Sequence, residues 1–314
     1  MKILIPIDGS YHSDCALESV LAEPWPKDSN FLVMTVAEPM HTLADSTLGS
    51  FGQMALRAQE ALDDDIHKLL KEAADKLREK FGAKNVTESF YEGRPAAQIL
   101  DIAQSWKADL IVMGAHGTSG YNDETLGDIC SIIVSHAPCS VRIVHYLSSA
   151  SLEKKLASHK PLVTSRLLLA IDRSVKSKVA VDAVVNRPWS DGATVQVLTV
   201  AASHVNPMHS RFFQAAEIEK AKDAIVKAEK SEAEKMVKEV ADKLEEKFGK
   251  GKVTYHVLEG HNIRSLILQV AQDWPADLIV IGAHGQDKNI IEHLLGSTAR
   301  AVVENAMCSV EVVR

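Results

Sequence analysis

Positive charge and long apolar runs are both scarce in this chain of 314 residues. Its formal net charge of −7 argues against broad contact with nucleic acid, which needs clustered lysine and arginine. No apolar run is long enough for a membrane helix, and Pro6 and Asp8 interrupt the first run before it could serve as a signal peptide. We therefore expect a protein that contacts neither nucleic acid nor a membrane.

Cysteine is also rare, and no two cysteines form a Cys-x-x-Cys pair. The four are Cys15, Cys130, Cys139 and Cys308. Few scattered thiols without an export signal are typical of a reducing compartment, so we expect a cytoplasmic location. An alternative use is a zinc cluster of Cys130, His136 and Cys139, although its spacing fits no closed zinc site well.

Two sequence fingerprints of phosphate binding are absent. Neither G-x-x-x-x-G-K-S/T nor a G-x-G-x-x-G after a first predicted strand occurs. The loops IDGSYHSD (7–14) and IDRSVKSK (171–178) also lack the Ser-Gly-Gly-x-Asp-Ser-like sequence that a pyrophosphatase-type ligase would need. Any phosphate site must therefore use other residues.

What the chain does contain is a duplication. The segment ADLIVMGAHG at 108–117 returns as ADLIVIGAHG at 276–285, and further matches continue along the whole length at nearly the same offset. This indicates two homologous domains of about 150 residues rather than a short-period solenoid. We place the domains at 1–147 and 163–314, joined by a Ser/Lys-rich linker at 148–162.

Within each half, short apolar runs alternate with helical patterns. The two longest helical patterns cover 54–81 and 212–248, and Gly82 and Gly249 follow them where a helix C-terminus is expected. Five strands separated by helices predict an α/β fold with a doubly wound parallel sheet in each half. In such sheets, ligands bind beyond the carboxyl ends of the strands, where the strand order reverses.

A glycine-rich segment starts where the fourth strand of each half is expected to end. In the second half it reads Gly282-Ala-His-Gly285 and continues, after ten residues, with Gly296-Ser297-Thr298. Glycines let the main chain approach a phosphate, and a helix beginning near Gly296 would supply unpaired N–H groups. A tight turn followed by an ordinary helix cap is the alternative interpretation of the same residues.

Together these features resemble the universal stress protein family over essentially the whole chain. The resemblance rests on the strand-end aspartates, the doubled ADLIV-x-GAHG segment, the later Gly-Ser, and the closing strands that contain SVRIV and SVEVV. It implies the adenine nucleotide α-hydrolase-like fold, with five parallel strands in the order 3-2-1-4-5 in each domain. It also implies dimers through the last strands, which a tandem chain would form within itself, with a homodimer of whole chains as a second arrangement.

The family has members that bind ATP and members that bind no nucleotide. The resemblance therefore implies a stress-response protein that binds ATP or another adenine nucleotide, with or without Mg²⁺, in its second half. There Asp172 would hold a ribose hydroxyl or a divalent cation, and the main chain of Val200 would hold adenine. The residues that match the family's site are Ala170, Asp172, Val200, Gly282, His284, Gly285, Gln286, Gly296, Ser297 and Thr298.

The first half departs from this pattern at Asp128, which stands where the hydroxyl residue is expected. We predict that its carboxylate caps the following helix and repels a triphosphate, since two like charges about 4 Å apart repel by roughly 4 kcal/mol at an effective dielectric constant of 20. The first site is therefore expected to be degenerate for ATP.

No catalytic residue is expected in either half. His116 and His284 lie in the turns without a nucleophile or carboxylate paired to them in the pattern, which allows at most slow ATP hydrolysis. The alternative function is a scaffold that binds no nucleotide or a carrier of another small ligand. A ligand or metal site of His41, His204 and His209, in the loops after the second strands, stays open as well.

Overall fold

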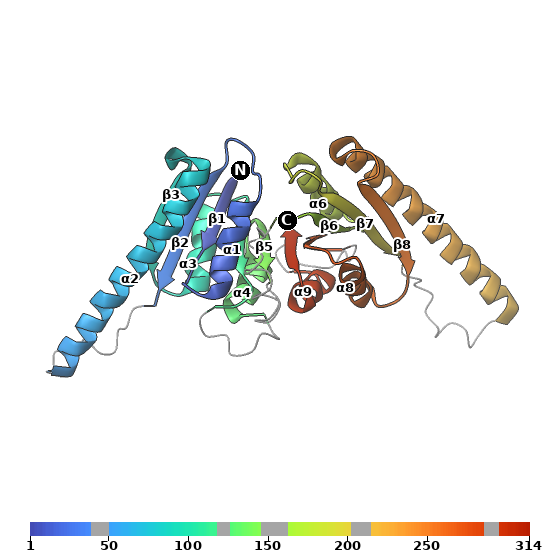
Figure 1. Cartoon of the computed structure of the whole chain (residues 1–314). Coiled ribbons are helices and arrows are strands. Elements are labelled where there is room, and N and C mark those ends of the chain that lie inside the picture. Colours follow the sequence, from blue (N-terminus) through green and yellow to red (C-terminus); the bar gives the residue numbers. More distant parts are fainter. Residues whose placement is uncertain (39–49, 118–125, 146–162, 202–214, 286–294) are drawn as a thin grey trace. The chain divides into compact units, whose positions relative to one another are not determined.

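The computed structural model describes residues 1–38, 50–117, 126–145, 163–201, 215–285 and 295–314, with the main chain alone for 50–60 and 215–223. The chain divides into two compact units, Met1–Val163 (unit 1) and Thr164–Arg314 (unit 2). Figure 1 shows each unit as a sheet flanked by helices. The predicted linker at 148–162 lies outside the described residues.

Strands and helices alternate in each unit in the predicted order. Unit 1 contains β1 (Lys2–Pro6), α1 (Tyr11–Ala22), β2 (Asn30–Ala37), α2 (Ser50–Phe81), β3 (Val86–Glu92), α3 (Pro95–Ser105), β4 (Leu110–Gly114), α4 (Asp128–His136) and β5 (Ser140–Val144). Unit 2 contains β6 (Arg166–Ala170), α6 (Val175–Asn186), β7 (Thr194–Ala201), α7 (Ala215–Phe248), β8 (Val253–Glu259), α8 (Ile263–Asp273), β9 (Leu278–Gly282), α9 (Ser297–Asn305) and β10 (Ser309–Val313).

The strands of each unit pair in parallel. Their order is β3-β2-β1-β4-β5 in unit 1 and β8-β7-β6-β9-β10 in unit 2, which confirms the predicted fold and strand order. The apolar runs LIVMG and LIVIG form β4 and β9, and every residue of these strands is buried because helices cover both faces of the sheet. The strand order reverses beside β1 and beside β6, so each unit has a switch point at the carboxyl end of its first strand.

The long helices α2 and α7 end where the glycines predicted. Gly82 and Gly249 have φ angles of +88° and +94°, a conformation that a side chain disfavours, so the helix stops there. The helices begin at Ser50 and Ala215, a few residues from the predicted starts at 54 and 212. In the described ranges, no helix is long and apolar enough to cross a membrane.

A buried ion pair fastens the last strand of each unit to the end of its first helix. In unit 1, Arg142 of β5 donates to Glu23 at 2.7 Å, and both side chains are at most 5% exposed. Unit 2 carries the opposite charges at these positions, with Arg187 after α6 bonded to Glu311 of β10. In each unit, the arginine also lies 5.6 Å from the ring centre of the tryptophan in a Pro-Trp pair. The fold therefore requires opposite charges at these two positions but accepts either direction.

Exchanging the two partners should be far less damaging than removing one. Arg142→Met removes the guanidinium that is hydrogen-bonded to the buried Glu23 carboxylate and should lower the free energy of unfolding by about 3–5 kcal/mol. The double variant Glu23→Arg with Arg142→Glu reproduces the arrangement of unit 2 and should recover most of that loss in urea unfolding. Equal losses in the single and the double variant would show that the direction of the pair matters too.

Candidate functional site

A hydrogen-bonded turn follows the first strand of unit 2 and orients Asp172. One oxygen of its carboxylate, Oδ1, accepts the Ser174 N–H at 2.9 Å and the Ser177 hydroxyl at 2.6 Å. The Asp172 N–H in turn donates to Ser177 Oγ at 2.9 Å. This leaves the second oxygen, Oδ2, on the side of Gly285. The turn holds a carboxylate at the carboxyl end of β6, at the switch point of the sheet.

The same turn is bonded to the loop that follows β9. The Ser174 hydroxyl accepts the Ser177 N–H at 3.1 Å, which caps α6, and donates to the His284 carbonyl at 3.2 Å. Unit 1 repeats these contacts, because Ser10 caps α1 and lies 3.5 Å from the His116 carbonyl oxygen. In both halves, a hydrogen bond therefore joins the turn after the first strand to the loop after the fourth strand at the switch point. We call these two joined segments the main-chain frame.

Close packing explains the glycines of the duplicated segment. A Cβ at Gly282 would lie 2.9 Å from the main chain of Lys176, and one at Gly285 would lie 3.0 Å from Oδ2 of Asp172. A Cβ at Gly296 would lie 3.1 Å from a loop carbonyl oxygen. The equivalent glycines of unit 1 are equally crowded. These glycines shape the frame in both units, so they do not by themselves separate a ligand site from a tight turn.

The helix α9 starts directly after a glycine. Gly296 is the N-cap residue and provides no side-chain acceptor, while Ser297 is already the first helical residue. The first N–H groups of α9 therefore receive no side-chain acceptor from the cap residue, and the positive end of the helix dipole lies beside them. In unit 1, Gly127 likewise caps α4 without a side-chain bond, so the predicted capping role of Asp128 is wrong. Its carboxylate sits at the first helical position because Gly127 takes the cap position.

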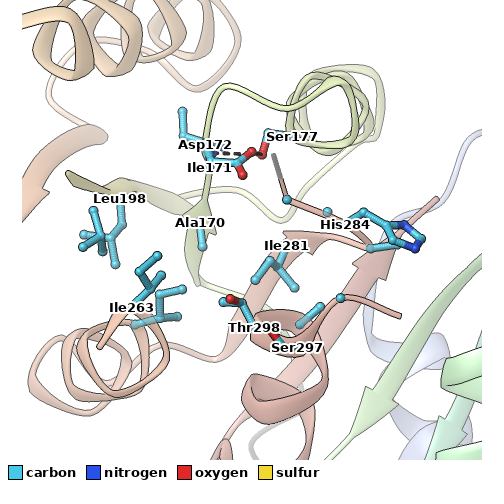
Figure 2. A pocket seen from close by; sticks show the side chains of 17 residues that line it. Ala170, Ile171, Asp172, Ser177, Leu198, Ile263, Ile281, His284, Ser297 and Thr298 are labelled. Carbon is cyan, nitrogen blue, oxygen red and sulfur yellow. Dashed lines mark hydrogen bonds between the residues drawn. The ribbon is translucent and has the colours of Figure 1, made fainter. Parts of the chain in front are cut away.

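The turn after β6, the end of β9 and the start of α9 surround one cavity, which Figure 2 shows from close by. Its empty space, open mouth included, is about 720 Å³. Nine of the ten residues predicted from the sequence line it, and the tenth, Gln286, lies outside the described residues. The nine are Ala170, Asp172, Val200, Gly282, His284, Gly285, Gly296, Ser297 and Thr298.

The apolar wall of the cavity was not predicted. It is formed by Leu198 of β7, Ile281 of β9, and Ile263 and Ile267 of α8. In the sequence, isoleucines of a helix look like ordinary core residues, because no local pattern indicates which face of α8 lies against a cavity. Ser177 was missed as well, although the repeated Asp-x-Ser-x-x-Ser pattern in the two halves was a usable signal.

The main chain of Val200 brings one donor and one acceptor to the cavity. The Ile171 N–H donates to the Leu198 carbonyl at 2.9 Å, so the main-chain groups of Leu198 point toward β6. Alternate residues of a strand present these groups on the same side, so the N–H and C=O of Val200 also point that way. Ala170 is the last residue of β6 that pairs with β7. Val200 therefore extends past the paired part of the sheet, at the cavity wall.

His284 contributes its main chain to the cavity and turns its ring away from Asp172 and Ser297 (Figure 2). Burial lowers the pKa of its imidazole, and the positive charges of Arg314 and Lys176 lower it further. The ring is therefore neutral at neutral pH. Among the described residues that line the cavity, Asp172 is then the charged side chain, and positive potential comes from the helix terminus.

The corresponding place in unit 1 has different side chains on the same frame. Asp128 replaces Ser297, Ile129 replaces Thr298, and Cys130 follows. The Cys130 thiol is buried against the Gly114 carbonyl oxygen at 2.9 Å, and burial raises its pKa to about 12. Cys130 is thus a hydrogen-bonded core residue, and no three His, Cys, Asp or Glu side chains are grouped for a metal ion among the described residues, which argues against the zinc-cluster alternative.

Metal sites elsewhere find no support in the part of the chain that the structure describes, where no three His, Cys, Asp or Glu side chains are grouped for a metal ion. The histidines of the other candidate site, His41, His204 and His209, lie outside the described residues.

Comparisons with known proteins agree with this architecture. The model of the universal stress protein family matches residues 1–145 and again 164–314. Universal stress protein MJ0531 of Methanocaldococcus jannaschii is 32% identical over 143 residues, which are 46% of this chain and 81% of that protein. A universal stress protein of Thermus aquaticus is 32% identical over 146 residues, 45% of this chain and 96% of that protein.

Two solved structures share the fold over nearly the full length. A universal stress protein from Archaeoglobus fulgidus has a TM-score of 0.56 and 18% identity, covering 100% of this chain and 96% of its own. A functionally unknown protein from Pseudomonas aeruginosa PAO1 has a TM-score of 0.58 and 14% identity, covering 99% and 92%. With the family model matched in both halves, the chain belongs to the universal stress protein family and carries the family's domain twice.

Proposed function

We propose that unit 2 binds an adenine nucleotide, with ATP as the ligand, and that the chain acts as a nucleotide-responsive regulator in a stress response. The observation that carries this proposal is the start of α9. Its cap residue, Gly296, offers no side-chain acceptor, and Ser297 and Thr298, which unit 1 replaces with Asp128 and Ile129, line the same cavity as Asp172. An uncapped helix N-terminus with hydroxyl groups beside it favours a phosphate.

The opposite end of the cavity suits adenine. The base would stack among Leu198, Ile263 and Ile267, and its edge would meet the main chain of Val200. Adenine offers an amino donor and a ring-nitrogen acceptor side by side, which match one carbonyl and one N–H. Guanine offers an acceptor and a donor in the reverse order, so both main-chain groups would face the wrong partner.

Asp172 lies between these two ends, where a ribose would sit. Its Oδ2 faces Gly285 and could accept a ribose hydroxyl. Carboxylate and hydroxyl oxygens are also the ligands that Mg²⁺ prefers, so Asp172 and Ser297 fit a magnesium ion that enters with the phosphates. Bound there, the ion would neutralise phosphate charge.

We infer a binding role rather than efficient catalysis. Among the described residues that line the cavity, Asp172 and His284 carry the side chains that could act as an acid or a base. The Asp172 carboxylate already accepts two hydrogen bonds, and the His284 ring points away. Neither is placed to activate water, which leaves at most slow ATP hydrolysis.

Unit 1 favours the alternative function, a domain that binds no nucleotide. The negative charge of Asp128 and the apolar side chain of Ile129 occupy the positions of the two hydroxyl residues. The cytoplasmic location, the pairing of the two domains and a homodimer of chains stay predictions.

Gly285→Val should weaken ATP binding by at least about tenfold, a loss of about 1.4 kcal/mol. Its Cβ would lie 3.0 Å from Oδ2 of Asp172 and would push the carboxylate out of the cavity. Calorimetric titration with ATP measures the change. The matched control is Gly117→Val, whose Cβ would lie 2.8 Å from Oδ2 of Asp8 in unit 1. Equal weakening by both variants, or no binding by the wild type, would contradict a site in unit 2.

Asp128→Ser should give unit 1 measurable affinity for ATP. The variant removes a charge that repels phosphate by up to roughly 4 kcal/mol before solvent screening, and it supplies a hydroxyl. The measurement is ATP titration in a Gly285→Val background, where binding to unit 2 is weakened and a new site in unit 1 stands out. Asp128→Asn is the control that removes the charge without adding a hydroxyl. If neither substitution restores binding, Asp128 is not what prevents it.

ATP should bind about 10- to 100-fold more tightly than GTP, because the reversed donor and acceptor of guanine would leave two main-chain groups of Val200 unsatisfied at about 1 kcal/mol or more each. Competition between the two nucleotides in a thermal-shift titration measures the ratio. Equal affinities would show that the main chain of Val200 does not select the base.

A further inference from the structure

The helix α7 extends past the part of unit 2 that it covers. Its first buried residue in the described part of the chain is Ala233, and none of the side chains at 224–232 is buried. We call residues 224–232 the α7 arm. Figure 1 shows this end of α7 extending beyond the end of β8.

Two ion pairs fasten the α7 arm to the loops that border the cavity. Lys230 Nζ lies 2.8 Å from Oε1 of Glu259, the last residue of β8, four residues before Ile263 of the cavity wall. Glu232 lies 2.8 Å from Arg173, the residue directly after Asp172. The arm therefore contacts two segments that border the cavity, next to the residues proposed to hold the ribose and the base.

Unit 1 does not have these two pairs. Gly9 stands in place of Arg173, and Asp63 stands in place of Lys230, so Glu92, the counterpart of Glu259, would face a charge of its own sign. A different ion pair, which joins the long helix of each unit to the first helix of that unit, is present in both units. It joins α2 to α1 through Lys76 and Glu18, and α7 to α6 through Lys243 and Asp182. The two ion pairs of the α7 arm therefore occur only in the unit with the described cavity. The pair farther along the helix occurs in both units and therefore belongs to the fold that they share.

We propose that the α7 arm reports whether the cavity is occupied, an inference that rests on the proposed nucleotide binding. A ligand that contacts Asp172 and Ile263 restricts the loops that carry Arg173 and Glu259. Through their ion pairs, the restriction passes to the exposed turns of α7. Exposed ion pairs are weak individually, so the arm responds by a several-fold change in order rather than by a rearrangement. A partner that binds the ordered arm would then distinguish the loaded protein from the empty one.

The test is hydrogen exchange of the full chain with and without saturating ATP, read in peptides that cover the α7 arm. In the wild type, ATP should slow exchange of the arm by about threefold or more. The double variant Arg173→Gly with Lys230→Asp installs the residues of unit 1. It should abolish the slowing while the dissociation constant of ATP, measured by calorimetry, changes by less than about twofold.

Lys243→Asp is the matched control, because it reverses one lysine of α7 in the pair farther from the cavity. It should leave the ATP-dependent slowing in place. This inference would be overturned if ATP bound the wild type without slowing exchange in the arm, or if the slowing persisted in the double variant. Either result would leave the proposed function standing. Calorimetry that detects no ATP binding to the wild type would overturn both.

Discussion

The site depends on the hydrogen bond between the Ser174 hydroxyl and the His284 carbonyl, which joins the loops after β6 and β9. These strands are neighbours whose connections leave in opposite directions, so their loops part and a crevice opens between them. The short Asp-x-Ser-x-x-Ser turn closes the crevice at one end and directs one carboxylate oxygen toward it. Everything placed around the cavity, from the glycine contacts to the start of α9, presupposes that these two loops are held together.

The two units show how far side chains can change on one frame. The turn, the glycines and the uncapped helix start are present in both, and the buried ion pair persists even with its charges exchanged. What differs is the charge and polarity at the crevice, above all at Asp128 and Ser297. Under the proposed function, unit 2 keeps a site for an anionic ligand, whereas unit 1 keeps the fold without that site. Residues that shape the main chain are shared because the fold needs them, whereas residues that meet a ligand are free to diverge.

Prediction from sequence succeeded where a local pattern has one physical cause. Continuous apolar runs indicated buried parallel strands, the repeat indicated two domains, and Gly82 and Gly249 marked the helix ends through their positive φ angles. It failed for the cap of α4, because Asp128 and the preceding glycine both suit a helix start and only the main-chain path decides which residue takes the cap position. It also missed Ile263 and Ile267, since their apolar side chains look the same whether they face a core or a cavity.

By itself, the amino-acid sequence determined the fold class, the strand order through a family resemblance, and nine of the residues that line the cavity, because each depends on short-range patterning or on a motif with fixed spacing. Only the tertiary structure decided which way the side chains face. It turned the His284 ring away from the cavity, brought the isoleucines of α8 to its wall, and set Lys230 and Glu232 of α7 against the loops around it. These contacts join residues that are far apart in the chain, and their geometry follows from how the helices pack on the sheet.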